Sequence, residues 1–455
     1  MNVVTTILAA GQGKRMRSRA AKVLHPIGGK PMLRHVLELA LQFSSVKPVV
    51  VIGHQGAQIR EAFKNEAVDW VEQSEQRGTG HAVLQASSHF AADDLVVILY
   101  GDVPLLRPES IRQLIEAAAD DGLAILSCRV QNPTGYGRVL RSESGKVLGI
   151  VEHRDASPSE LGINEINTGI MVCSGQRLHK WLPALGTDNA QGEYYLTDCV
   201  ALAVAEGLPV GSVCLEDPQE AQGVNDRRQL ASMEREFQMR CALALLDGGV
   251  TLADPARLDV RGSLDCGDDV TVDVNVVFEG NVRLGDNVHI GPNCVIRASE
   301  IGDGVTVLPH SLIDSALIGE GCQIGPFARI RPGTVLEKNV HVGNFVEVKN
   351  SLVGAGSKAN HLSYLGDATV GKHVNIGAGT ITCNYDGARK HRTIIEDDVF
   401  VGSDTQLVAP VRVGHGVTIA AGTTVTEDVD SNRLVISRVR QKTISGWSRP
   451  RKENK

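Results

Sequence analysis

Aromatic side chains are scarce in this chain. Phenylalanine, tyrosine and tryptophan make up 4% of its residues, whereas glycine accounts for 48 of them. This imbalance indicates an architecture of tight turns with small and β-branched side chains rather than one large aromatic core. The length of 455 residues exceeds what one ordinary hydrophobic core organises, so we expect at least two domains.

Paired cysteines, a basic N-terminal start and long apolar runs are also missing. The nine cysteines are scattered, with no Cys-x-x-Cys pair and no cluster with histidine, so neither a zinc site nor a disulfide framework is expected. The first basic residue, Lys14, follows the first apolar run, which is the reverse of a signal peptide. No stretch approaches the ~18 apolar residues of a membrane span. These absences predict a reduced, soluble, cytoplasmic protein with no membrane insertion.

The chain also has no excess of positive charge. The net charge is -7, and charged residues make up an ordinary 22% of the chain. This balance argues against general affinity for nucleic acid, so no nucleic-acid partner is expected. A substrate that carries phosphate would need basic side chains placed locally.

The first half of the chain alternates short apolar runs with amphipathic stretches. The runs Val3–Leu8, Pro48–Ile52, Leu95–Leu99, Leu123–Ser127 and Gly169–Cys173 are predicted to be buried strands, and Met32–Phe43, Gly80–Ala91 and Pro108–Ala119 to be helices. This alternation predicts an α/β domain with a mostly parallel sheet covered on both faces. Ligands of such sheets bind beyond the carboxyl ends of the strands.

One long linker helix is predicted next, over residues 226–247. Asp226 is its expected N-cap, and Gly248-Gly249 ends it. Its predicted apolar stripe consists of Leu230, Met233, Phe237, Cys241 and Ala244.

From about Val260 an aliphatic or small residue recurs every six positions, with occasional slips of phase. The longest run is Val260, Cys266, Val272, Phe278, Leu284, Ile290 and Ile296, and later runs are Ile318, Ile324, Ile330, Leu336, Val342 and Val348, and Ile395, Val401, Leu407, Val413, Ile419 and Val425. Alternation by two within a period of six predicts very short strands joined by tight turns, which stack as a parallel β-helix of triangular section. At about 18 residues per coil there is room for roughly nine or ten coils.

A glycine-containing loop follows the first predicted strand. In Leu8-Ala9-Ala10-Gly11-Gln12-Gly13-Lys14-Arg15-Met16 the glycines let backbone N–H groups approach a triphosphate, and the basic residues offset its charge. The loop matches neither a Walker A nor a Gly-x-Gly-x-x-Gly pattern. Asp102 ends another predicted strand, where a magnesium ligand is expected, although a turn aspartate before Pro104 would look the same.

These segments, with Lys22 before Val23-Leu24-His25-Pro26, Gln73, and Gly78-Thr79-Gly80, resemble the signature of sugar-phosphate nucleotidyltransferases. The resemblance implies a Rossmann-like domain in which Arg15 and Lys22 are catalytic and Asp102 and Asn225 bind Mg²⁺. It assigns binding of UTP and the UDP-sugar to Leu8, Ala9, Ala10, Gly11, Lys22, Gln73, Gly78, Thr79, Tyr100, Gly101, Asp102, Gly137, Glu152, Asn167 and Asn225. The less favoured alternative is that Arg15 and Lys22 are only surface charges.

The repeat in the second half resembles the hexapeptide acyltransferases, whose β-helices wind left-handed. Polar residues occur at Glu347–Asn350, His361–Asp367 and Asn375–Thr380, about one coil apart, and a polar loop over Thr382–Arg392 then interrupts the repeat. An amine that attacks a thioester must lose a proton, and a neutral histidine accepts one near pH 7. The resemblance gives this role to His361. It assigns Arg331, Lys349, Tyr364 and Asn375 to the sugar phosphate, and Ala378, Asn384, Tyr385, Ser403, Ala421 and Arg438 to acetyl-CoA.

Along its whole length the chain resembles the bacterial bifunctional N-acetylglucosamine-1-phosphate uridylyltransferase and glucosamine-1-phosphate acetyltransferase family. The family acetylates glucosamine 1-phosphate from acetyl-CoA and then transfers uridylyl from UTP, which feeds peptidoglycan and lipopolysaccharide synthesis. The resemblance implies a uridylyltransferase domain (1–226), a linker helix (227–249), a β-helix acetyltransferase domain (250–437) and a basic C-terminal tail (438–455). It also implies a homotrimer formed through the β-helix.

Two other readings remain open. One is a hexose-1-phosphate nucleotidylyltransferase whose β-helix only oligomerises, and the other is a non-catalytic scaffold of the same two folds. Enzymes of the first kind lack the combination of Lys349, His361, Tyr364 and Asn384, which this sequence contains. The second is expected to lose Asp102, Arg15 or Lys22, and all three are present.

Overall fold

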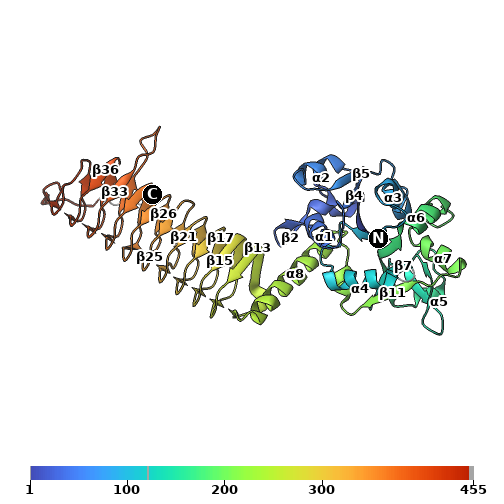
Figure 1. Cartoon of the computed structure of the whole chain (residues 1–455). Coiled ribbons are helices and arrows are strands. Elements are labelled where there is room, and N and C mark those ends of the chain that lie inside the picture. Colours follow the sequence, from blue (N-terminus) through green and yellow to red (C-terminus); the bar gives the residue numbers. More distant parts are fainter. Residues whose placement is uncertain (1, 120–121, 450–455) are drawn as a thin grey trace, which may run out of the picture. The chain divides into compact units, whose positions relative to one another are not determined.

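The structure is a computed structural model that describes residues 2–119 and 122–449 (Figure 1). The chain divides into two units, Met1–Met239 and Arg240–Lys455, which meet inside one helix. Each unit has a hydrophobic core of its own.

Unit 1 is built on a nine-stranded sheet with the main order β11-β7-β10-β6-β1-β4-β5. These strands are β1 (Val3–Ala9), β4 (Val49–Ile52), β5 (Asp69–Glu72), β6 (Leu95–Tyr100), β7 (Leu123–Arg129), β10 (Glu165–Ser174) and β11 (Gly211–Leu215). All pairings along this path are parallel except those of β10, which runs antiparallel to both β6 and β7. A hairpin of β8 (Arg138–Arg141) and β9 (Val147–Val151) joins β10.

Helices cover both faces of this sheet, as the alternating pattern predicts. Successive residues of β4 point to opposite sides, so Val50 belongs to one buried cluster and Val49 and Val51 to another. On the first side lie α1 (Met32–Ala40), α2 (Gly56–Ala62) and α4 (Pro108–Ala119), and on the second α3 (Thr79–Gln85), α6 (Gly175–Trp181) and α7 (Asp198–Ala205). The helix predicted over residues 80–91 is split into α3 and the 3₁₀ turn η3 (Ser87–His89). A short helix, α5 (Pro158–Leu161), follows the β8–β9 hairpin.

The linker helix is α8 (Arg227–Asp247). Met233 is fully buried in a cluster of unit 1 residues, whereas Ala242 is fully buried in the core of unit 2. The predicted stripe is wrong at its end, because Ala244 is exposed and Leu245 packs on the core instead. A single helical period predicts one continuous stripe, whereas the helix buries a different face at each end against a different core.

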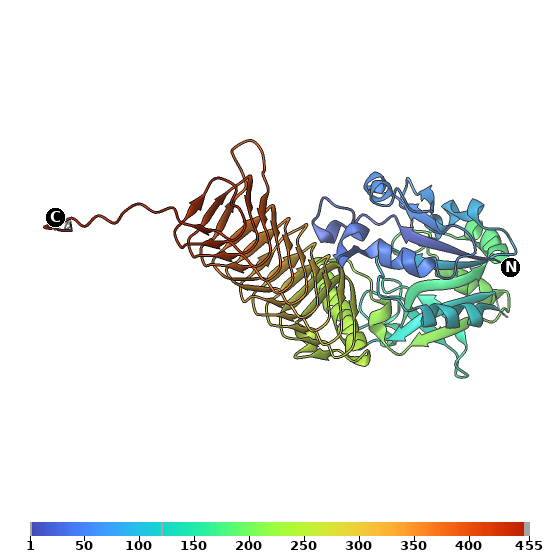
Figure 2. The same ribbon diagram turned by 60° about the vertical axis from the view of Figure 1, so that its left-hand side comes forward.

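Unit 2 is a left-handed parallel β-helix of short stacked strands, seen from two directions in Figures 1 and 2. One face is an eleven-stranded sheet, so the stack slightly exceeds the nine or ten coils expected. Its strands are β12 (Thr251–Leu252), β14 (Thr271–Val272), β16 (His289–Ile290), β19 (Thr306–Val307), β22 (Gln323–Ile324), β25 (His341–Asn344), β28 (Lys358–His361), β31 (Asn375–Ile376), β34 (Phe400–Val401), β37 (Thr418–Ile419) and β39 (Leu434–Val435).

A seventeen-stranded sheet forms the other two faces. It contains β13 (Leu258–Cys266), β15 (Val276–Leu284), β17 (Val295–Arg297), β18 (Glu300–Ile301), β20 (Leu312–Asp314), β21 (Leu317–Ile318), β23 (Arg329–Ile330), β24 (Val335–Leu336), β26 (Glu347–Lys349), β27 (Leu352–Val353), β29 (Tyr364–Gly366), β30 (Ala368–Val370), β32 (Ile381–Cys383), β33 (Thr393–Ile395), β35 (Gln406–Val408), β36 (Val411–Val413) and β38 (Thr424–Val425).

The six-residue period marks the side chains that point into the prism. Ile324, Ile330, Val342, Val348 and Val401 are all fully buried. Hydrogen bonds join each strand to the equivalent strand of the next coil. The paired residues are 17 or 18 positions apart in the sequence, as in Val295 with Leu312 and Leu317 with Val335. The polar segment 384–392 lengthens one coil, so that Lys372 contacts Asp397, 25 positions on.

The basic tail leaves this stack as an extended segment (Figure 2). Residues 436–449 have no regular secondary structure, as expected, and the tail residues Arg451, Lys452 and Lys455 lie outside the described part of the chain. Among the described residues, no helix combines the length and the hydrophobicity needed to cross a membrane.

Candidate functional sites

A cavity of about 290 Å³ lies at the carboxyl ends of β1 and β6. The two ends are adjacent because Leu8 pairs with Tyr100 and the Gly101 N–H donates to the Leu8 carbonyl (2.9 Å). The predicted binding residues that line the cavity are Leu8, Ala9, Ala10, Gly11, Lys22, Gln73, Gly78, Thr79, Tyr100 and Asp102. Five further residues line it that were not predicted to bind a ligand, namely Gln12, Val23, Gln76, Ala82 and Glu193. Arg15 is exposed on the turn η1 (Lys14–Met16) and does not line the cavity.

The loop after β1 is held close to Lys22. Gly13 has a φ of 59°, and a Cβ added there would lie 2.8 Å from the Lys22 Cβ, so only glycine fits without displacement. Gln76 fixes the other side of the loop, since its Nε2 donates to the Ala10 carbonyl (3.0 Å). Gln76 was missed because it belongs to a separate loop with no motif of its own.

Lys22, Asp102 and Asn225 converge at one edge of the cavity. The Lys22 ammonium forms an ion pair with Asp102 and a hydrogen bond with the Asn225 Oδ1 (3.3 Å). Asn225 is brought there by the Val224 N–H, which donates to the Asp102 carbonyl (2.9 Å). Two oxygens that share one cation form the kind of donor set that Mg²⁺ uses together with substrate phosphates, so the residues fit this metal.

Three further predicted residues, Gly137, Glu152 and Asn167, form a second group, in which the charge of Glu152 acts on Tyr100. The Asn167 N–H donates to the Gly137 carbonyl (2.9 Å), and the Thr197 hydroxyl donates to Glu152 (3.3 Å). Burial, aided by Asp155 and Asp198, raises the pKa of Glu152, and burial followed by the charges of Glu152 and Asp102 raises the pKa of Tyr100. The buried Asn167 Oδ1 has no hydrogen-bond partner among the described residues, so it is available to a ligand.

In unit 2 the predicted acetyl-CoA residues form a column on successive coils. Ala378, Ser403 and Ala421 each lie two positions after a buried residue of β31, β34 and β37, and His361 occupies the same position on β28. Arg438 closes the column by donating from Nε to the Ala421 carbonyl (3.0 Å). At the other end, the His361 Nδ1 lies 2.8 Å from the Asn344 Oδ1, a contact that sequence reasoning missed.

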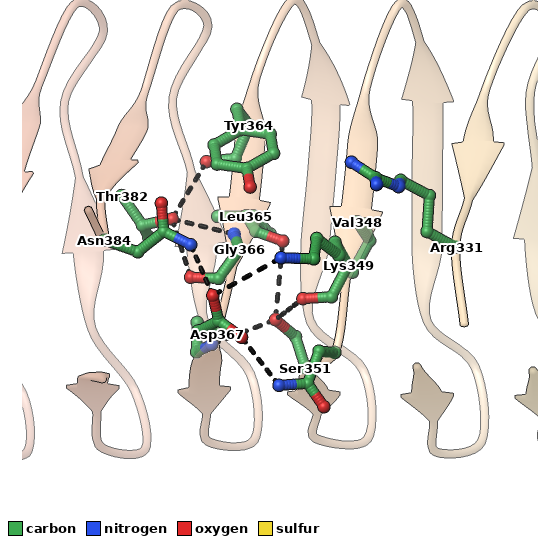
Figure 3. Close-up of polar contacts among 12 residues, drawn as sticks. Arg331, Val348, Lys349, Ser351, Tyr364, Leu365, Gly366, Asp367, Thr382 and Asn384 are labelled. Atoms are coloured by element: carbon green, nitrogen blue, oxygen red, sulfur yellow. Dashed lines mark hydrogen bonds and ion pairs between the residues drawn. The ribbon is translucent and has the colours of Figure 1, made fainter. Parts of the chain in front are cut away.

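A cluster of charges lies on the neighbouring face, around Asp367 (Figure 3). Asp367 accepts hydrogen bonds from Asn384 and from Asn350 (2.6 Å), and the Lys349 ammonium lies 3.7 Å away. Burial alone would raise the pKa of Asp367, but these hydrogen bonds and the charges of Lys349 and Lys390 lower it.

Arg331 is held in the same row of coils by Glu347, which accepts from its Nη1 (2.7 Å). Lys390 stands beside Lys349, whose hydrogen bond and charge lower the pKa of Lys390. Three cations gathered on one face suit a phosphate group. Lys390 belongs to the polar segment Thr382–Arg392. No sequence pattern gave it a role there.

The remaining predicted residues lie around the edge where these two faces of the β-helix meet. Tyr364 lies on β29 next to the cluster (Figure 3), whereas Asn375 lies on β31 in the eleven-stranded sheet. Tyr385 is 62% exposed in the inserted loop, where its hydroxyl donates to the Gly387 carbonyl (2.6 Å). The predicted sugar-phosphate residues therefore occupy two faces that meet near His361.

Known domain families match both units. The MobA-like NTP transferase domain matches residues 5–184, the GMPPB C-terminal domain residues 260–359, and the bacterial transferase hexapeptide (six repeats) residues 392–427. A nucleotidyl transferase from Methanothermobacter thermautotroptrophicus aligns over 52% of this chain and 97% of its own at 17% identity with a TM-score of 0.37, a likeness too low to bear on fold or activity. Fold, sites and domain matches together define an enzyme of two transferase domains, a nucleotidyltransferase followed by a hexapeptide-repeat transferase.

Three relatives narrow this class to one family. The bifunctional protein GlmU of Ralstonia nicotianae is 55% identical over 457 residues, covering 100% of both chains, and that of Azoarcus sp. is 56% identical over 447 residues, covering 98% of this chain and 99% of its own. That of Methylococcus capsulatus is 55% identical over 456 residues, covering 100% and 99%. This chain belongs to the GlmU family and is a bifunctional uridylyltransferase and acetyltransferase of UDP-N-acetylglucosamine synthesis.

Proposed function

We propose that the cavity of unit 1 binds UTP and N-acetylglucosamine 1-phosphate, and that Asp102 and Asn225 hold Mg²⁺ between them. The observation that carries this proposal is the convergence of both oxygens on the Lys22 ammonium. Bound there, Mg²⁺ would neutralise charge on the phosphates of the nucleotide. Lys22 is then free to contact a phosphate itself.

The uridylyl step needs alignment more than proton transfer. A phosphate oxygen of the sugar phosphate attacks the α-phosphorus of UTP, the bond to the β-phosphate oxygen breaks, and pyrophosphate leaves. Backbone N–H groups of the loop after β1 bind the triphosphate, while Lys22 and Arg15 offset its charge. Gly137, Glu152 and Asn167 hold the sugar beyond Tyr100, where the unpartnered Asn167 oxygen offers an acceptor.

For unit 2 we propose acetyl transfer at the corner that carries His361. The amine of glucosamine 1-phosphate attacks the thioester carbonyl of acetyl-CoA, His361 takes the amine proton, and the carbon–sulfur bond breaks to release coenzyme A. Arg331, Lys349 and Lys390 hold the phosphate, Tyr364 and Asn375 the sugar. Ala378, Asn384, Tyr385, Ser403, Ala421 and Arg438 line the acetyl-CoA site.

The site residues of unit 2 occupy two faces of one prism, which favours a second copy of the chain as a wall of the acetyl-CoA site. We therefore propose a homotrimer formed through the β-helix, and a cytoplasmic location where UTP and acetyl-CoA are supplied.

One assay tests the acetyl half directly: consumption of acetyl-CoA in the presence of glucosamine 1-phosphate, in the wild type and in His361→Ala. Loss of a general base typically slows a reaction by about 10² to 10⁴. We expect a fall of this size, with uridylyl transfer from supplied N-acetylglucosamine 1-phosphate intact and partial recovery at high pH, where more substrate amine is free. Near-normal acetylation at neutral pH would remove His361 from the mechanism.

A further inference from the structure

The column of acetyl-CoA residues extends one coil beyond His361, to Asn344. Asn344 and His361 are register partners of β25 and β28, and each lies two positions after a buried residue, Val342 and Ala359. Asn344 is half-buried and His361 is exposed. The register therefore places an amide side chain directly beside the imidazole, on the side away from Ala378.

The contact fixes which ring nitrogen carries the proton. The His361 Nδ1 lies 2.8 Å from the Asn344 Oδ1, and an amide oxygen can only accept a hydrogen bond. Nδ1 must then be the protonated nitrogen of the neutral ring, which leaves the lone pair on Nε2. We propose that Asn344 is a positioning residue for acetyl transfer, which holds His361 as the Nδ1–H tautomer with Nε2 free to accept the amine proton.

This inference rests on the proposed role of His361 as the base, and the chemistry of the amide supports it. A carboxylate in place of Asn344 would also accept from Nδ1, but its charge would favour the protonated ring, which cannot accept another proton. A neutral acceptor orders the ring and leaves it basic. The other titratable groups nearby are His341 on β25, whose pKa is lowered by burial and by the charges of Lys358 and His361, and Lys358 on β28.

Three variants distinguish a positioning role of Asn344 from an effect on folding. Asn344→Leu removes the acceptor, and we expect kcat for acetyl transfer to fall by about 10- to 100-fold while the KM values for both substrates change little, as for a misplaced catalytic group. Asn344→Asp keeps the acceptor, and the pH at which acetyl transfer reaches half its maximum should move upward, with kcat recovered at high pH. Gln323→Leu, an amide replaced by leucine on an exposed position of the same sheet, is the matched control and should match the wild type in both respects.

A direct readout is NMR of the histidine ring nitrogens in isotope-labelled full-length protein, with His361 assigned by its loss in His361→Ala. We expect protonation at Nδ1 in the wild type and a mixture of tautomers in Asn344→Leu. A wild-type ring protonated at Nε2, or an Asn344→Leu variant with full kcat beside an inactive His361→Ala, would overturn the positioning role alone. An active His361→Ala would instead overturn the proposed base, and this inference with it.

Discussion

At the scale of single residues, the proposed metal site depends on two side chains that are far apart in the sequence. Asp102 follows β6 and Asn225 precedes α8, and the backbone bond from Val224 to Asp102 joins them. Asp102→Asn removes the carboxylate and should lower uridylyl transfer by at least about 100-fold, because charge on the phosphates is then left uncompensated. Pyrophosphate release measures this loss.

Acetyl-CoA consumption by the same protein is the control for Asp102→Asn. Because the proposed acetyl-transfer site lies in the other unit, which has a core of its own, acetyl-CoA consumption should stay near the wild-type rate. A folded variant in which both activities fell together would contradict two separate sites.

A second residue-scale prediction concerns the stability of unit 1. Glu165 is buried on β10 and accepts from Arg141 Nε (2.8 Å) and Nη2 (2.5 Å) and from the Ser127 hydroxyl (2.7 Å). Burial alone would raise its pKa, but the bonds from Arg141 and Ser127 outweigh it and lower the pKa of Glu165. A lowered pKa stabilises the fold fully above the ordinary value of 4.5, and this contribution is lost as the pH falls through the folded-state value.

Glu165→Gln should therefore reduce the free energy of unfolding by about 1.5–3 kcal/mol near neutral pH, the range for hydrogen bonds to charged groups. The difference from the wild type should shrink as the pH falls below 4.5 and through the lowered pKa of Glu165 in the folded state. Urea unfolding at several pH values measures it, with the exposed Glu143→Gln as control. A difference that grew toward acid would contradict the assignment.

At the scale of elements, strand β29 carries Tyr364 and the glycine that makes room for its ring. A Cβ added at Gly366 would lie 2.3 Å from the Tyr364 hydroxyl oxygen, closer than any real contact. Gly366→Ala should displace the phenol and raise the KM for glucosamine 1-phosphate by about 10-fold, corresponding to the loss of one hydrogen bond. The KM for acetyl-CoA should stay at the wild-type value.

A double-mutant cycle distinguishes this displacement from damage to the coil. If Gly366→Ala acts through Tyr364, then adding it to Tyr364→Ala should cost little more, since the ring it would strike is gone. Fully additive losses would mean that the alanine disturbs the β-helix itself.

At the scale of the whole molecule, the boundary between the units falls inside α8. Met233 is fully buried in unit 1, and the Glu234 carboxylate accepts from the Gly28 N–H (2.8 Å). A fragment that ends after Arg227 loses both contacts, whereas one that ends after Met239 keeps them. We expect fragment 1–239 to be a stable monomeric uridylyltransferase and fragment 1–227 to have a lower Tm, because a lost core methionine costs about 2–5 kcal/mol.

Calorimetry on the two fragments compares their Tm values, and sedimentation gives their size. The full chain serves as the reference for association through the β-helix. A trimer of fragment 1–239 would contradict a β-helix-based assembly, and equal Tm values would contradict the contribution of α8.

Both folds and most of the cavity of unit 1 could be predicted from the amino-acid sequence alone. The six-residue period predicts the β-helix because each inward side chain recurs locally, with no need to know which coils pair. The loop after β1 and Asp102 after β6 could be placed together because parallel strands bring their carboxyl ends to one edge.

Contacts that depend on how coils and helices stack become visible only in the three-dimensional structure. The contact between Asn344 and His361 needs the coil-to-coil register, and Lys390 approaches Lys349 from an inserted loop that turns back on itself, where Lys390 pairs with Tyr385. The burial of Ala242 rather than Ala244 follows from which core each end of α8 meets. Periodicity reports the direction a side chain takes from its own element, whereas its neighbours are set by hydrogen bonds and packing between elements far apart in the sequence.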